Sequence, residues 1–169
     1  MILVIGGGGF VGQAYPRLFE RLGLPYTIVT RENYDALSGI DCDLLINANG
    51  NSKKFLSDQD PVFDFDASVT SVVRSLERFK PRRYVLLSSG DVYPTQRSPA
   101  ETQESAALDT TQMSRYGFHK YLAEMVVNAI HPAPLVIRMG GFVGPGMRKN
   151  AIFDMLNDAP VWLHPDSEL

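Results

Sequence analysis

The N-terminus constrains the fold more than any other part of the chain, because an apolar run leads directly into a cluster of glycines, Met1-Ile2-Leu3-Val4-Ile5-Gly6-Gly7-Gly8-Gly9-Phe10-Val11-Gly12. Four apolar residues bounded by turn residues predict a buried strand over 2–5. Glycines lack a Cβ and permit the tight turn that follows. Apolar residues then recur at helical spacing and predict a helix over 10–22, which Pro16 is expected to kink. A strand, a glycine turn and a helix in this order are typical of α/β folds.

The rest of the chain alternates between short apolar runs and segments of helical period. The apolar runs predict buried strands over 26–29, 44–46, 84–87 and 135–137. Apolar residues three or four apart predict helices over 61–79 and 115–130, and a short helix over 151–156. The polar segment 95–113 is expected to be a long surface loop. Strands separated by helices predict an α/β fold of the doubly wound type with a parallel sheet.

Length and composition exclude several classes of protein. The 169 residues are 44% hydrophobic and 21% charged, which is ordinary for a globular domain. A net charge of −3 gives no basic excess for nucleic acid or an anionic membrane, and no apolar run is long enough to span a bilayer. The lone cysteine, Cys42, is expected to be a buried structural thiol, which favours a cytoplasmic protein. No Cys, Asp or Glu stands near a histidine at metal-ligand spacing, so no metal site is predicted.

The glycine turn predicts a phosphate-binding site. Gly6, Gly9 and Gly12 are spaced G-x-x-G-x-x-G, and Phe10 and Val11 lie between the last two. Without side chains the backbone can approach a pyrophosphate, and the free N–H groups and positive dipole end of the following helix favour that anion. We therefore predict a Rossmann-type dinucleotide-binding domain over 1–140.

The end of the second strand bears on the choice of dinucleotide. Thr30 and Arg31 follow the strand, and an acidic residue comes only at Glu32. In dinucleotide-binding folds an acidic residue here binds the ribose 2′-hydroxyl of NAD, whereas an arginine accommodates the 2′-phosphate of NADP. Arg31 therefore favours NADP over NAD; the alternative is a solvated loop charge.

A serine, a tyrosine and a lysine form a candidate catalytic set. Tyr116 and Lys120 are four residues apart on the predicted helix and share one face. The lysine charge is expected to lower the pKa of the phenol and make it a usable acid or base. Ser88 and Ser89 follow the strand over 84–87, at the kind of edge where open α/β sheets bind ligands. Taken singly each pattern is common, and the order along the chain is what points to a site.

Taken together, these motifs resemble those of the extended short-chain dehydrogenase/reductase family, the NAD(P)-dependent sugar epimerases and dehydratases. The resemblance covers nearly the whole chain and rests on Gly6-x-x-Gly9-x-x-Gly12, Asp60-Pro61, Ser88-Ser89-x-x-Val92-Tyr93, Tyr116-Gly117-x-x-Lys120 and the segment Arg138 to Gly146.

The resemblance implies a role for each site residue. Tyr116 would exchange a proton with the substrate oxygen while hydride passes to or from the nicotinamide. Lys120 would bind the nicotinamide ribose, and Ser89, rather than its neighbour Ser88, matches the catalytic serine. The segment 141–143 would lie near the nicotinamide.

The chain also departs from the family pattern. The stretch from Arg31 to Asp43 is short for the family's extra β–α unit, and Ser68 replaces a usual asparagine. His119 stands where the family often has Ser or Thr, and we interpret it as a helix-surface variant. Asp64 and Asp66 are interpreted as solvated side chains on different sides of their helix.

The resulting hypothesis is an enzyme, an NAD(P)-dependent oxidoreductase, epimerase or dehydratase acting on a nucleotide-linked sugar. Residues 141–169 are expected to be the start of a substrate-binding region, most of which the chain lacks, as in a truncated or reduced form. The alternatives are a dinucleotide-binding module without turnover and a nucleotide-sugar 4-keto reductase. A homodimer formed through the helices over 61–79 and 115–130 is also expected from the resemblance.

Overall fold

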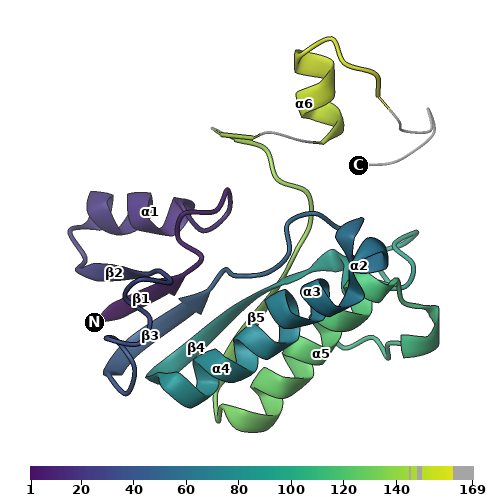
Figure 1. Cartoon of the computed structure of the whole chain (residues 1–169). Helices are drawn as coiled ribbons and strands as arrows, with labels where there is room; N and C mark the ends of the chain where they lie inside the picture. The colour runs from purple at the N-terminus through teal and green to yellow at the C-terminus, as the bar shows by residue number, and fades with distance from the viewer. Residues whose placement is uncertain (145, 148–149, 162–169) are drawn as a thin grey trace. The chain divides into compact units, whose positions relative to one another are not determined.

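The computed structural model describes residues 1–144, 146–147 and 150–161, and the chain divides into two compact units, Met1–Met139 and Gly140–Leu169. Within the described residues, five strands form one parallel sheet in the order β2-β1-β3-β4-β5 (Figure 1). The strands are β1 (Ile2–Ile5), β2 (Tyr26–Val29), β3 (Asp41–Asn47), β4 (Lys80–Ser89) and β5 (Pro134–Met139). The predicted Rossmann-type parallel sheet is therefore confirmed, although β3 and β4 begin earlier than the apolar runs.

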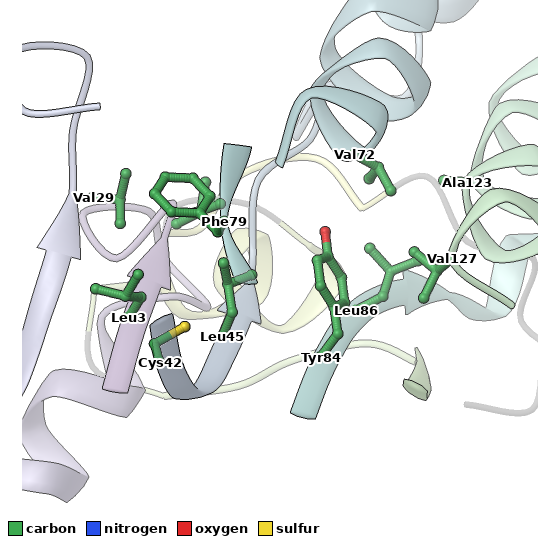
Figure 2. Packing of buried hydrophobic residues seen from close by; sticks show 11 residues of the cluster. Leu3, Val29, Cys42, Leu45, Val72, Phe79, Tyr84, Leu86, Ala123 and Val127 are labelled. Atoms are coloured by element: carbon green, nitrogen blue, oxygen red, sulfur yellow. The ribbon is translucent and has the colours of Figure 1, made fainter. Parts of the chain in front are cut away.

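Helices cover both faces of the sheet because each buried strand alternates its side chains. On one face, Leu3 of β1 belongs to a buried cluster with Val72 and Val127, which come from two helices (Figure 2). On the other face, Val4 packs with Phe19 of the N-terminal helix. Cys42 is buried in the first cluster, as predicted for a structural thiol.

The N-terminal helix α1 (Ala14–Leu22) begins four residues later than predicted. Residues 10–13 form hydrogen-bonded turns instead, in which the N–H groups of Gln13 and Ala14 donate to the carbonyls of Gly9 and Val11. Pro16 consequently lies in the first helical turn, where its missing N–H would have no intrahelical acceptor. The expectation of a kink at Pro16, which assumed a position inside the helix, is wrong for this reason.

The predicted helix over 61–79 is interrupted. It consists of α3 (Pro61–Phe65), a π-helical turn η1 (Asp66–Thr70) and α4 (Ser71–Arg78), after a short α2 (Leu56–Gln59). Asp60 caps α3 by accepting from the N–H of Phe63 at 3.0 Å. Phe79 ends the helix in an extended conformation and is buried.

The helix α5 (Arg115–Ile130) matches its prediction and packs beside α3 and α4 (Figure 1). Ser114 caps it by accepting from the N–H of Gly117 at 3.1 Å. The polar segment before it holds only a short 3-10 turn, η3 (Thr110–Gln112), and a similar turn, η2 (Gly90–Val92), follows β4.

The second unit contains α6 (Ala151–Leu156), capped by Asn150. The predicted short helix is therefore confirmed. Pro145, within the motif Arg138 to Gly146, lies outside the described residues. Among the residues described, no helix is long and apolar enough to cross a membrane.

Candidate active site

The glycine turn follows β1 and depends on the absence of side chains. Gly6 has a positive φ of 77°, and a Cβ there would lie 2.8 Å from the backbone of Ala48 at the end of β3. A Cβ on Gly12 would lie 2.1 Å from the carbonyl oxygen of Gly6. The turn folds back on itself so closely that only glycine fits at these two positions.

The turn also presents backbone donors. Gly9 donates its N–H to the Gly6 carbonyl at 3.0 Å, which closes the turn. Phe10 and Val11 follow in the turn that precedes α1, and Phe10 is 38% exposed. Their N–H groups lie just before a helix N-terminus, where an anion is favoured.

Arg31 lies at the carboxyl end of β2, next to β1 and the glycine turn. Its side chain is exposed, and the adjoining backbone is held by Asn33, which accepts from the N–H of Thr30 at 2.7 Å. Residues 31–40 connect β2 to β3 through turns and contain no helix or strand. Within the described residues β2 is therefore the outermost strand on its side of the sheet, as the short stretch in the sequence indicated.

The two serines at the end of β4 have different surroundings. Ser88 is 2% exposed and donates its hydroxyl to the buried carboxylate of Glu124 on α5, which also pairs with Arg138 at 2.8 Å. Ser89 is only half-buried, and its hydroxyl lies near enough to the Tyr116 phenol to lower the pKa of that phenol. Ser88 is thus a structural residue, and Ser89 is the serine that faces the tyrosine.

Tyr116 and Lys120 lie together, as their spacing predicts. The Lys120 ammonium is 5.9 Å from the centre of the Tyr116 ring. It also lies against Gly50 in the segment after β3, where a Cβ would come within 2.6 Å of Nζ. The Tyr116 hydroxyl donates to the carbonyl of Asn51 at a long 3.4 Å. The segment 50–51 therefore supports both side chains.

The electrostatics of Tyr116 differ from the sequence expectation. Burial raises the pKa of Tyr116 to about 12, the charges of Asp91 and Asp64 act in the same direction, and the nearby Ser89 hydroxyl opposes them. Burial also lowers the pKa of Lys120, against the charges of Asp64 and Glu124. The expected lowering of the phenol pKa by Lys120 is wrong for the protein alone, because desolvation and two carboxylates outweigh the ammonium.

Asp91 places a carboxylate next to Ser89 at this site. It accepts from the Ser89 hydroxyl at 3.1 Å and forms an ion pair with Lys54, which is exposed. Nothing in the spacing of Asp91 and Lys54 along the chain indicates that they meet, since α2, α3, η1, α4 and β4 lie between them.

Sequence reasoning misjudged two residues behind the Tyr116–Lys120 pair. Asp64 was expected to be solvated and His119 to lie on the helix surface, yet they are 0% and 7% exposed. They contact each other, with His119 Nδ1 2.6 Å from Asp64 Oδ2. Asp66, by contrast, is exposed as predicted. Both interpretations failed because α3 packs against α5, which covers the helix faces that carry these residues.

The site thus gathers groups from separate segments at one edge of the sheet. The glycine turn follows β1, Gly50 and Asn51 follow β3, and Ser89 ends β4. These strands are parallel neighbours, so their carboxyl ends share an edge. Open α/β sheets bind ligands at this edge, which makes it the candidate site.

Comparisons with known proteins agree with this geometry. A structure of UDP-galactose 4-epimerase superimposes with a TM-score of 0.73 and 23% sequence identity, over 93% of this chain and 61% of that chain. A structure of RMD from Pseudomonas aeruginosa complexed with NADPH gives a TM-score of 0.69 and 21% identity, over 88% of this chain and 57% of that chain. An NAD-dependent NDP-hexosamine 5,6-dehydratase, TunA, gives a TM-score of 0.73 and 21% identity, over 92% of this chain and 61% of that chain. The chain therefore spans less than two thirds of the length of these proteins, with which it shares the fold.

At the level of sequence, the comparison with curated proteins found no match. The sequence model described as "NAD dependent epimerase/dehydratase family" matches residues 2–159. Because this match spans nearly the whole chain and the site carries the motifs in their structural context, the chain belongs to the NAD-dependent epimerase/dehydratase family.

Proposed function

We propose that the protein binds NAD(P) along the carboxyl edge of its sheet and acts, through Ser89, Tyr116 and Lys120, on a hydroxyl or keto group of a nucleotide-linked sugar. One observation carries the proposal: Ser89, Tyr116 and Lys120 come together at the sheet edge that holds the glycine turn, with the Lys120 ammonium 5.9 Å from the centre of the Tyr116 ring and the Ser89 hydroxyl near the phenol.

Each residue of the site would have its own role. The turn Gly6, Gly9, Phe10, Val11, Gly12 would hold the pyrophosphate through backbone N–H groups. Lys120 would bind the nicotinamide ribose through its ammonium. Bound nicotinamide supplies the hydride acceptor or donor. Tyr116, which lies beside Ser89, would take or give the proton of the substrate oxygen.

The choice of substrate is supported by what similar structures contain. One similar structure holds UDP-glucose and NAD, at 20% identity and a TM-score of 0.71. We propose that residues 141–169 begin the region that contacts the sugar nucleotide. The turn-rich crossing over 31–40 also suits a nucleotide-sugar 4-keto reductase, and a dTDP-4-dehydrorhamnose reductase from Yersinia enterocolitica shares the fold at 17% identity.

A second candidate function is dinucleotide binding without turnover. The observation that favours it is the Tyr116 phenol, whose pKa of about 12 leaves almost no phenolate to act as a base at neutral pH in the protein alone. Hydride transfer from added UDP-glucose to NADP+ or NAD+, or from NADPH or NADH to an added 4-keto nucleotide sugar, separates the two candidates. Turnover that Tyr116→Phe abolishes supports the enzyme, and binding without turnover supports the module.

The cofactor site is tested by isothermal titration with NADPH and NADH. Gly9→Asp introduces a carboxylate next to the proposed pyrophosphate, at a position where a Cβ meets only the Gly6 carbonyl, at 3.3 Å. We expect micromolar binding by the wild type and loss of about a hundredfold or more in Gly9→Asp from charge repulsion. Gly9→Asn is the matched control, because it adds the same volume without the charge. Equal losses in both variants would contradict the phosphate-binding role.

The preference between the two dinucleotides rests on Arg31, whose exposed side chain is free to meet a 2′-phosphate. We propose NADP as the favoured form. Arg31→Ala is expected to weaken NADPH binding about tenfold and to leave NADH binding unchanged. A similar effect on both ligands would contradict this assignment.

A homodimer through α3, α4 and α5 also remains a proposal. The exposed apolar side chains of Val62, Phe63 and Phe65 on α3 and Met125 on α5 support it. Sedimentation equilibrium of the wild type and Val62→Asp tests it, since a charge at this position should dissociate a dimer.

A further inference from the structure

A buried acid–base pair lies behind the proposed catalytic residues and has no part in the mechanism above. Asp64 of α3 is fully buried, and His119 of α5 is 7% exposed. His119 Nδ1 and Asp64 Oδ2 are 2.6 Å apart, so the pair shares a hydrogen bond. The ring of Phe65 stands edge-on to the imidazole at 5.4 Å and covers it. A charge-bearing pair that is removed from water is costly unless every polar atom has a partner.

The second oxygen of Asp64 connects the pair to the site. Asn51 donates its side-chain amide to Asp64 Oδ1 at 2.8 Å. The same amide group closes the turn after β3, because its Nδ2 donates to the Lys53 carbonyl and its Oδ1 accepts from the Lys53 N–H. The backbone carbonyl of Asn51 accepts from the Tyr116 hydroxyl. The carboxylate therefore anchors the segment on which the phenol rests.

The charge of Asp64 acts on both members of the site. Burial lowers the pKa of Lys120, and Asp64 and Glu124 raise it. Asp64 also raises the pKa of Tyr116, after burial and Asp91. Asp91 faces the phenol from η2 and is itself paired with Lys54. Two carboxylates thus oppose the effect of burial on Lys120. Asp64 comes from α3, whereas Glu124 comes from α5 and is paired with Arg138.

We propose that Asp64 and His119 are positioning residues of the Tyr116–Lys120 pair: the carboxylate, held in place by the imidazole, anchors Asn51 beneath the phenol and supplies a buried negative charge near Lys120. The inference rests on the proposed roles of Tyr116 and Lys120. His119 adjoins Lys120 in sequence, but its imidazole contacts Asp64 of α3, whereas the Lys120 ammonium lies beside Tyr116 and Gly50. One turn of α5 therefore carries both Lys120 and the histidine that supports the site.

Asp64→Asn separates an electrostatic role from a merely structural one. The readout is the pKa of Lys120, measured by NMR titration of 13Cε-labelled lysine and assigned with Lys120→Met. Loss of the counter-charge lowers the Lys120 pKa below its wild-type value. Loosened packing would instead admit water, relieve desolvation and raise that pKa. We expect the downward shift, and no shift in the matched control Asp66→Asn, which changes an exposed carboxylate two residues away.

The role of His119 is tested by two substitutions that differ in hydrogen bonding. His119→Gln keeps an N–H donor for Asp64, whereas His119→Leu removes it. Dinucleotide affinity is expected to fall about tenfold in the leucine variant and to stay within about threefold of wild type in the glutamine variant. Should Asp64→Asn fail to fold, this comparison still decides the inference.

The outcomes distinguish the inference from the proposed function. An unchanged or raised Lys120 pKa in Asp64→Asn, or equal affinities in the two His119 variants, would overturn the positioning role. A wild type that binds neither NADPH nor NADH would overturn the proposed function, and the Lys120 titration would still test the charge support.

Discussion

Gly117 provides the sharpest test of how the fold brings the serine and the tyrosine together. It follows Tyr116 in the first turn of α5, where the helix meets the backbone of the turn η2 that carries Asp91. A Cβ on Gly117 would lie 2.0 Å from the Asp91 carbonyl oxygen and 2.9 Å from its carbon. Both atoms are backbone, so neither can rotate away from an added methyl group.

The size of the effect of Gly117→Ala follows from this geometry. Ordinary contact begins near 3.4 Å, so α5 and the turn must separate by about 1.4 Å. Overpacking of this kind costs about 1–3 kcal/mol, and a backbone clash belongs at the upper end. Alanine returns about 1 kcal/mol through its higher helix propensity. The net loss of unfolding free energy is about 2 kcal/mol, which lowers Tm by about 4–8 °C for a chain of this size.

Thermal unfolding followed by circular dichroism measures this change. Gly8→Ala is the control, because no atom lies within 4 Å of a Cβ there, and its Tm is expected to stay within about 2 °C of wild type. The same separation would move Tyr116 away from Ser89. A Gly117→Ala variant that melts at or above the wild-type temperature would refute the claim that this close approach sets the Ser89–Tyr116 geometry.

Two further predictions concern buried polar groups. Burial raises the pKa of Tyr84 to about 12, so the folded state holds the phenol proton more tightly than the unfolded state does. The stability that this proton contributes is complete below pH 10 and is lost as the pH rises to about 12. Urea unfolding of Tyr84→Phe should show a smaller loss of stability at alkaline pH than the wild type, and an identical loss would contradict this reasoning. Tyr84→Phe should also be about 1–3 kcal/mol less stable at pH 7, because Asn47 and Ser75 lose its hydroxyl. Glu124→Gln removes the charge that holds Arg138 and is expected to cost about 3 kcal/mol in the same assay, with Glu77→Gln on α4 as control; a loss no larger than that of the control would show that the ion pair contributes little.

Much of the fold could be predicted because local patterns carry the information. The apolar run into glycines places β1 and its turn, since only a buried strand followed by Cβ-free residues accommodates that order. The spacing of Tyr116 and Lys120 places both on one helix face, because four residues complete about one turn. The parallel sheet follows from the alternation of strands and helices.

The positions of Asp64 and His119 could not be predicted in this way. A helical period tells which residues share a face, but a polar residue on a helix is buried only if another element covers that face. The packing of α3 against α5 covers both residues, and they become partners 55 residues apart in the chain. Ser88 and Ser89 were distinguished in the same manner, because packing buries Ser88 against Glu124 and leaves Ser89 half-buried near Tyr116.

The sequence by itself therefore determined the order of elements, the glycine turn and the residues that share a helix face, because these depend on spacing and on the shape of single side chains. Tertiary structure alone decided which polar groups lose contact with water, which carboxylates lie near the Tyr116 phenol and which serine reaches it. The sign of the Tyr116 pKa shift illustrates the difference: the neighbouring lysine predicts a lower value, and burial among groups from distant segments raises it.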